Sequence, residues 1–155
     1  MSDKAKGNLF VTAQFAILGV LVLLQGTFAD WRLPSWSLTV TYALLFVGFG
    51  TALNAVFGLG RAISANPVPS AKAKLVTHGA FASVRHPIYS GIMLGSVSLA
   101  ATTGTWLGVI ATVGLIVLLN FKARFEEKLL LAKFDDYREY ASRVGRFVPG
   151  IGKLK

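Results

Sequence analysis

The stretch IYSGIMLGSVSLAATTGTWLGVIATVGLIVLLNF, residues 88–121, carries no charged side chain. The short polar connection Thr103-Gly104-Thr105 divides it into two apolar segments, 88–103 and 106–121. Uncharged segments of this length predict membrane-crossing helices, and so short a connection can only return the second helix antiparallel to the first. The sequence therefore predicts a helical hairpin whose outer ends, at His86 and Glu126, return to the same edge of the membrane.

Two more uncharged blocks precede the hairpin, at residues 9–29 and 36–59. The chain of 155 residues is 54% hydrophobic and 15% charged, with a mean hydropathy of +0.59, which is typical of membrane proteins rather than soluble domains. We predict an all-α integral membrane protein with four transmembrane helices, forming a single membrane domain over residues 1–155. The two hairpin segments are short for a hydrocarbon core of about 30 Å, so we expect them to extend past these limits.

The first apolar block is predicted to be a membrane anchor. It is longer than the apolar region of a signal peptide, and no small-x-small cleavage pattern follows it at Phe28-Ala29-Asp30-Trp31. The chain has no cysteine, which excludes disulfides and thiolate metal sites. With only two histidines as well, we expect no metal site.

The formal net charge is +9, and the basic residues alternate between the two sides of the predicted bundle. Lys4 and Lys6 precede the first block, four Lys or Arg lie in the loop 60–87, and nine follow residue 121. By the positive-inside rule, both termini and this loop are cytoplasmic. Topology and anionic lipid headgroups explain the basic surplus, so nucleic acid is not an expected partner. The short chain favours a prokaryotic plasma membrane.

The C-terminal segment 122–155 is predicted to be an amphipathic helix lying along the interface. After Phe121 charged residues appear, but apolar residues still recur at helical spacing. Tyr137, Tyr140 and Phe147 then resemble an aromatic interfacial anchor.

Arg85-His86-Pro87-Ile88-Tyr89 stands where the loop enters the third span. Pro87 suits the first helical position, which places His86 at or near the N-cap, and helix N-termini favour anions. Each residue alone could simply anchor a helix end. Together with Gly79, where a backbone could approach a ligand closely, the group indicates a site.

Glu126-Glu127 is the second polar element. An ordinary helix-surface pair between Lys122 and Glu126, four residues apart, is the simplest interpretation. The position of the two carboxylates at the membrane border favours a functional interpretation, because carboxylates are costly to desolvate there and therefore require partners. Neighbouring helical residues point in different directions, so we expect one carboxylate to face a pocket and the other to face solvent.

These residues resemble the isoprenylcysteine carboxyl methyltransferase family, which is grouped with the phospholipid N-methyltransferases. The pattern LVTxGxYxxxRHPxYxG, a two-span hairpin, and then EExxLxxxF and YxxY appears here from Leu75 onward. The resemblance implies a membrane-embedded enzyme that transfers methyl from S-adenosyl-L-methionine. Carried over, the cofactor-binding residues are Leu75, Val76, Gly79, Phe81, His86, Pro87, Ile88, Tyr89, Glu126 and Glu127.

The resemblance also implies a substrate-binding basic residue one turn before the glutamate, which assigns that role to Lys122 and Arg124. Lysine here replaces the family's arginine, and Phe81 replaces its tyrosine. We expect Arg85, His86 and Glu127 as the catalytic residues, with His86 or Glu127 as the base if the acceptor must lose a proton. Independently of the family, a sulfonium is attracted to aromatic faces such as Tyr89.

The expected acceptor is small or lipidic and resembles an isoprenylcysteine carboxylate. Three alternatives stay open: a phospholipid N-methyltransferase, an NADPH enzyme similar to sterol reductases, and a non-enzymatic small membrane protein. A membrane lipid is the expected partner.

Overall fold

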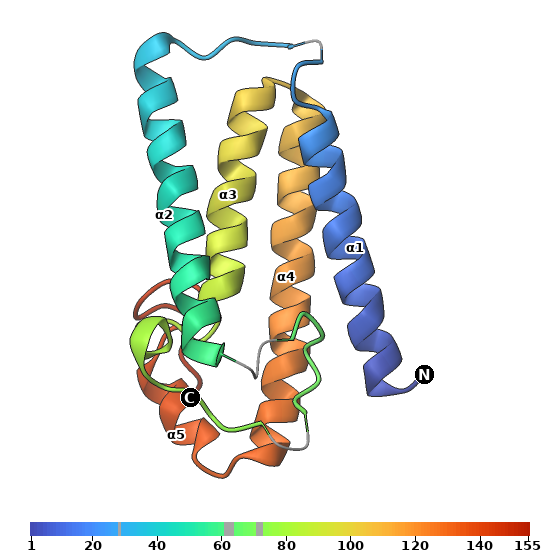
Figure 1. Cartoon of the computed structure of the whole chain (residues 1–155). Coiled ribbons are helices and arrows are strands. Elements are labelled where there is room, and N and C mark those ends of the chain that lie inside the picture. Colours follow the sequence, from blue (N-terminus) through green and yellow to red (C-terminus); the bar gives the residue numbers. More distant parts are fainter. Residues whose placement is uncertain (28, 61–63, 71–72) are drawn as a thin grey trace.

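The computed structural model describes residues 1–27, 29–60, 64–70 and 73–155, and Figure 1 shows their arrangement. Four long helices run side by side, and a short 3-10 helix and a short α-helix lie at one end of them. Within the described ranges there are two isolated β-bridges and no strand. The elements are α1 (Asp3–Leu23), α2 (Ser35–Leu59), η2 (Gly79–Ala82), α3 (Pro87–Thr103), α4 (Trp106–Lys133) and α5 (Tyr137–Arg143).

The predicted hairpin is α3 and α4. Gly104 turns the chain with φ +63°, and the Thr105 side chain caps α4 by accepting a hydrogen bond from the Gly108 N–H. A Cβ at Gly104 would lie 2.3 Å from the Trp31 carbonyl oxygen, so both the backbone conformation and the close approach require glycine. The outer ends of the hairpin meet at the opposite end of the bundle, as expected (Figure 1).

Among the described residues, three helices are long and apolar enough to cross a membrane: α1, α2 and α4. Helix α3 has 17 residues and is shorter than these. It packs closely on α2, because Gly48 and Gly91 let the two backbones touch. A Cβ at Gly91 would lie 2.4 Å from the Gly48 carbonyl oxygen.

The predicted bounds of the first apolar block are wrong. Helix α1 begins at Asp3 and ends at Leu23, instead of covering residues 9–29; Ser2 caps its start and accepts from the Ala5 N–H. Helix α4 continues past Phe121 without a break to Lys133, as expected for a segment that extends beyond its predicted limit. Segment 122–155 is therefore not one interfacial helix: its first turns extend α4, and its remainder folds back under the bundle.

Residues 134–155, the tail that follows α4, are held in place by backbone hydrogen bonds. Helix α5 is only seven residues long. After it, the Leu154 N–H donates to the Ala141 carbonyl at 2.9 Å, and the Arg85 N–H donates to the Gly145 carbonyl at 2.8 Å. The tail thus runs beside the segment that enters α3, and both termini lie at this end of the bundle (Figure 1).

Candidate functional site

The start of α3 meets α4 through an aromatic and acidic cluster. His86 is the N-cap of α3 and Pro87 its first residue, as predicted. The Tyr89 hydroxyl, one turn into the helix, donates to Glu126 Oε2 at 2.7 Å. The His86 and Tyr89 rings are stacked with centroids 5.2 Å apart, and His86 Nδ1 lies 3.7 Å from the same carboxylate oxygen. The two motifs, 40 residues apart in the chain, therefore form one site.

The two neighbouring carboxylates have different environments. The Glu126 side chain is 26% exposed, whereas that of Glu127 is 4% exposed. Glu127 Oε1 accepts from Arg85 Nη2 at 2.7 Å, and its Oε2 accepts from Arg146 Nη2 at 2.7 Å. His86 Nε2 lies 3.3 Å from Oε1. Glu127 is thus buried between two guanidinium groups. The expectation that one of the two carboxylates faces solvent is therefore wrong for Glu127.

Arg85 is saturated with internal partners. Its Nε and Nη2 donate to Glu127 at 2.9 and 2.7 Å, and its other donors reach three carbonyls of the C-terminal segment, at Ala141, Val144 and Gly152. A guanidinium has five N–H donors, and all five are used. Arg85, predicted as catalytic, therefore ties the C-terminal tail to α4 and has no donor left for a ligand.

Arg146 was missed by the sequence analysis. It donates to both oxygens of Glu127 and to the Asn120 amide oxygen. A buried carboxylate requires compensating cations, but nine basic residues follow residue 121, and nothing in their spacing distinguishes this one.

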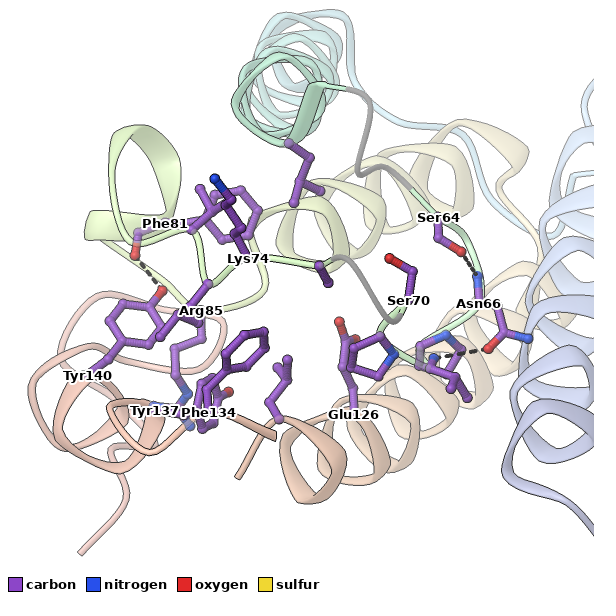
Figure 2. A pocket seen from close by; sticks show the side chains of 18 residues that line it. Ser64, Asn66, Ser70, Lys74, Phe81, Arg85, Glu126, Phe134, Tyr137 and Tyr140 are labelled. Atoms are coloured by element: carbon purple, nitrogen blue, oxygen red, sulfur yellow. Dashed lines mark hydrogen bonds between the residues drawn. The ribbon is translucent and has the colours of Figure 1, made fainter. Parts of the chain in front are cut away.

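A cleft of about 170 Å³ opens beside this cluster (Figure 2). The loop 64–70 lines one side of the cleft, and the opposite side is formed by Glu126 and Leu130 of α4 and by Phe134, the residue that caps the end of α4. The remaining wall includes Phe81 of η2 and, among the residues predicted for the cofactor, Leu75 and Val76.

The other residues predicted for the cofactor do not line this cleft. They are Gly79, His86, Pro87, Ile88, Tyr89 and Glu127. Of these, Tyr89 and His86 are coupled to the cleft through their contacts with Glu126. Gly79 adopts a left-handed conformation, φ +61°, where η2 begins.

The two residues predicted to bind the substrate are placed differently. Lys122 is buried, with its Nζ 2.7 Å from Gln14 Oε1 and 5.0 Å from the centroid of the Tyr89 ring. No ion pair within 4 Å joins Lys122 to Glu126, both of which the structure describes, so a helix-surface pair does not account for them. Arg124 is exposed on the other face of α4 and lines neither described cleft.

Tyr137 and Tyr140 belong to α5 and line the first cleft. The Tyr140 hydroxyl donates to the Phe81 carbonyl at 2.6 Å (Figure 2), and burial raises the pKa of this phenol to about 12. Tyr137 is 1% exposed, and its hydroxyl has no hydrogen-bond partner among the described residues. A buried hydroxyl without an acceptor costs free energy, so Tyr137 marks a position where a ligand acceptor would be stabilised.

A second cleft lies between α2, α3 and the tail. Val47 and Leu94 provide apolar walls, and Thr51 and Asn54 polar ones. Residues 80–85 separate it from the first cleft, because Phe81 and Arg85 line the first while Ala80, Ser83 and Val84 line the second.

A helix bundle in which three described helices are long and apolar enough to cross a membrane, with a cleft at one end, defines this protein as a membrane protein. The chain belongs to the phospholipid methyltransferase family, whose model matches residues 36–136. This confirms the family resemblance and makes it a membrane protein of a methyltransferase family. The match includes α2, where the sequence analysis found no motif, and excludes α1.

One curated relative is the cobalt-zinc-cadmium resistance protein CzcN of Cupriavidus metallidurans (strain ATCC 43123 / DSM 2839 / NBRC 102507 / CH34). It is 37% identical over 79 residues, which are 50% of this chain and 36% of the relative. The chain thus matches little more than a third of that protein. In the described part of this chain, no three His, Cys, Asp or Glu side chains are grouped to hold a metal ion.

Proposed function

We propose that this protein transfers a methyl group from S-adenosyl-L-methionine, bound in the cleft under the loop 64–70, to a small or lipidic acceptor. The observation that supports this most is the position of Glu126. It is the one carboxylate among the described residues of the cleft lining, and it is oriented by the Tyr89 hydroxyl at 2.7 Å.

The residues of the cleft fit the parts of this cofactor. Glu126 suits its ribose hydroxyls or its ammonium, and the Phe81 and Phe134 rings suit the adenine and the sulfonium. Lys74, at the edge of the cleft in Figure 2, supplies positive charge for its carboxylate. Arg85 is not assigned to that carboxylate, because its donors are occupied.

When bound, the cofactor supplies an electrophilic methyl group on a cationic sulfur. The electron pair of the acceptor forms a bond to the methyl carbon while the carbon–sulfur bond breaks, which leaves S-adenosylhomocysteine. The protein's task is alignment and exclusion of water, so no nucleophilic side chain is needed. A carboxylate acceptor needs no base. An amine or thiol acceptor must lose a proton, and His86, between the two carboxylates, is the base that we favour over the internally paired Glu127.

We further propose that α3 completes a four-span bundle with its site end in the cytoplasm. At about 1.5 Å per residue, its 17 residues extend for roughly 26 Å, close to a hydrocarbon core of about 30 Å. Lys4, Lys6 and the basic residues after 121 belong to the segments at the site end, which the positive-inside rule assigns to the cytoplasm. A prokaryotic plasma membrane is the membrane that we propose.

The acceptor that we favour resembles an isoprenylcysteine carboxylate, which is what the resemblance of the motifs from Leu75 onward implies. A phospholipid amine is the second candidate, favoured by the description of the family. Transfer of labelled methyl to extracted membrane lipids, compared with transfer to a prenylated cysteine, distinguishes the two.

Calorimetry with S-adenosylhomocysteine on the purified protein tests the cofactor. We expect binding by the wild type and a loss of at least about tenfold in Glu126→Gln, because hydrogen bonds to a charged group contribute about 1.5–3 kcal/mol. Glu139→Gln is the matched control, since the Glu139 side chain is 72% exposed on α5. Binding of NADPH but not of S-adenosylhomocysteine would instead support the sterol-reductase alternative, and binding of neither would support a non-enzymatic role.

A further inference from the structure

Helix α1 presents three buried residues at a spacing of seven: Gly7, Gln14 and Leu21. Leu21 packs in the apolar cluster with Leu115 and Leu119 of α4. Gln14 is the polar member of this row, near the middle of a helix apolar enough to cross a membrane. A polar side chain at such a place is costly without a partner, so its partner indicates why it is there.

The partner is the buried ammonium of Lys122. Gln14 Oε1 accepts from Lys122 Nζ at 2.7 Å, and the two residues are 4% and 1% exposed. None of the ion pairs in the described part of the chain involves Lys122. The hydrogen bond of this cation is therefore accepted by an uncharged oxygen from α1, 108 residues away in the chain.

The cation in turn contacts the cluster at the cleft. Lys122 Nζ lies 5.0 Å from the centroid of the Tyr89 ring, whose hydroxyl donates to Glu126. A cation over the face of an aromatic ring attracts it, and linked polar groups polarise one another. A shift of the ammonium would therefore remove one of the contacts of the Tyr89 ring, whose hydroxyl orients the Glu126 carboxylate.

We propose that Gln14 is a positioning residue of the site, acting from α1 through Lys122 and Tyr89 on Glu126. Helix α1 lies outside residues 36–136, the part matched by the family model. The inference rests on the proposed function in one respect: the affected ligand is taken to be the cofactor in the cleft.

The experiment compares Gln14→Met with the double variant Gln14→Met/Lys122→Met. Two quantities are measured on each: the Tm without ligand and the affinity for S-adenosylhomocysteine. Gln14→Met leaves an ammonium buried without its acceptor, so both quantities should fall, the affinity by about fivefold or more. The double variant removes both polar partners, so its Tm should recover while its affinity stays low.

A merely structural role predicts a different result. In that case the double variant recovers its affinity together with its Tm, and the inference is overturned. Gln14→Glu provides a second test that does not depend on this recovery, because its carboxylate still accepts from Lys122. It should bind close to the wild-type affinity, and a loss as large as that of Gln14→Met would also overturn the inference.

Gln25→Met is the matched control. Gln25 Nε2 donates to the Leu99 carbonyl at 3.1 Å and so joins the other end of α1 to α3, far from the cleft. Its loss should leave the affinity unchanged. Absence of binding by the wild type would overturn the proposed function, whereas wild-type binding with full affinity in the double variant would overturn the role of Gln14 alone.

Discussion

Replacing Glu127 by glutamine should destabilise the folded protein much more than the same change at Glu126. The Glu127 side chain is 4% exposed and compensates two guanidinium groups, those of Arg85 and Arg146. Removing one partner of a buried ion pair costs about 3–5 kcal/mol. For a chain of this size, about 2–4 °C of Tm corresponds to each kcal/mol, so Glu127→Gln should lower the Tm by roughly 6–20 °C.

Glu126→Gln changes a carboxylate that is 26% exposed and accepts one hydrogen bond, from Tyr89. The glutamine oxygen can still accept that bond, so the cost should be at most about 1 kcal/mol, or about 2–4 °C. Thermal unfolding of both variants in the same detergent, without ligand, measures the difference. Equal losses of Tm would refute the assignment of Glu127 to the fold and of Glu126 to the cleft.

Three further predictions follow from the buried contacts. Tyr137→Phe should keep or slightly raise the ligand-free Tm, because the Tyr137 hydroxyl has no partner among the described residues, and it should weaken binding of S-adenosylhomocysteine. Tyr140→Phe should instead lower the Tm, because it loses the hydrogen bond of 2.6 Å to the Phe81 carbonyl. Gly91→Ala should lower the free energy of unfolding by about 1–3 kcal/mol, because the added Cβ would lie 2.4 Å from a carbonyl oxygen of α2. Gly50→Ala is the control: its Cβ would have no atom within 4 Å, so it should cause no destabilisation by overpacking. Burial raises the pKa of Tyr140 to about 12 from an unfolded value of about 10, so the stability that its neutral form contributes should be present below about pH 10 and be lost between about pH 10 and 12. Unfolding curves over that range should show a smaller loss in Tyr140→Phe; a loss remains because burial also raises the pKa of Tyr137.

The sequence by itself determined the hairpin and the meeting of its ends. Uncharged runs on both sides of Gly104 leave few arrangements other than two antiparallel helices, and Pro87 determines where the motif of residues 85–89 becomes helical. These are local constraints of helix length and backbone geometry. The approach of His86 to Glu126 follows from them without knowledge of any packing.

Only the tertiary structure decided which carboxylate faces the cleft, what Arg85 binds, and that Gln14 holds Lys122. The last two depend on contacts with residues 42 to 108 positions away, in α4, in the C-terminal tail and in α1. A helix that is apolar on all sides does not indicate which face it turns to its neighbours, because lipid and protein interior are equally apolar. The rotation of α1 about its axis, and with it the position of Gln14, is therefore determined only when the helices pack.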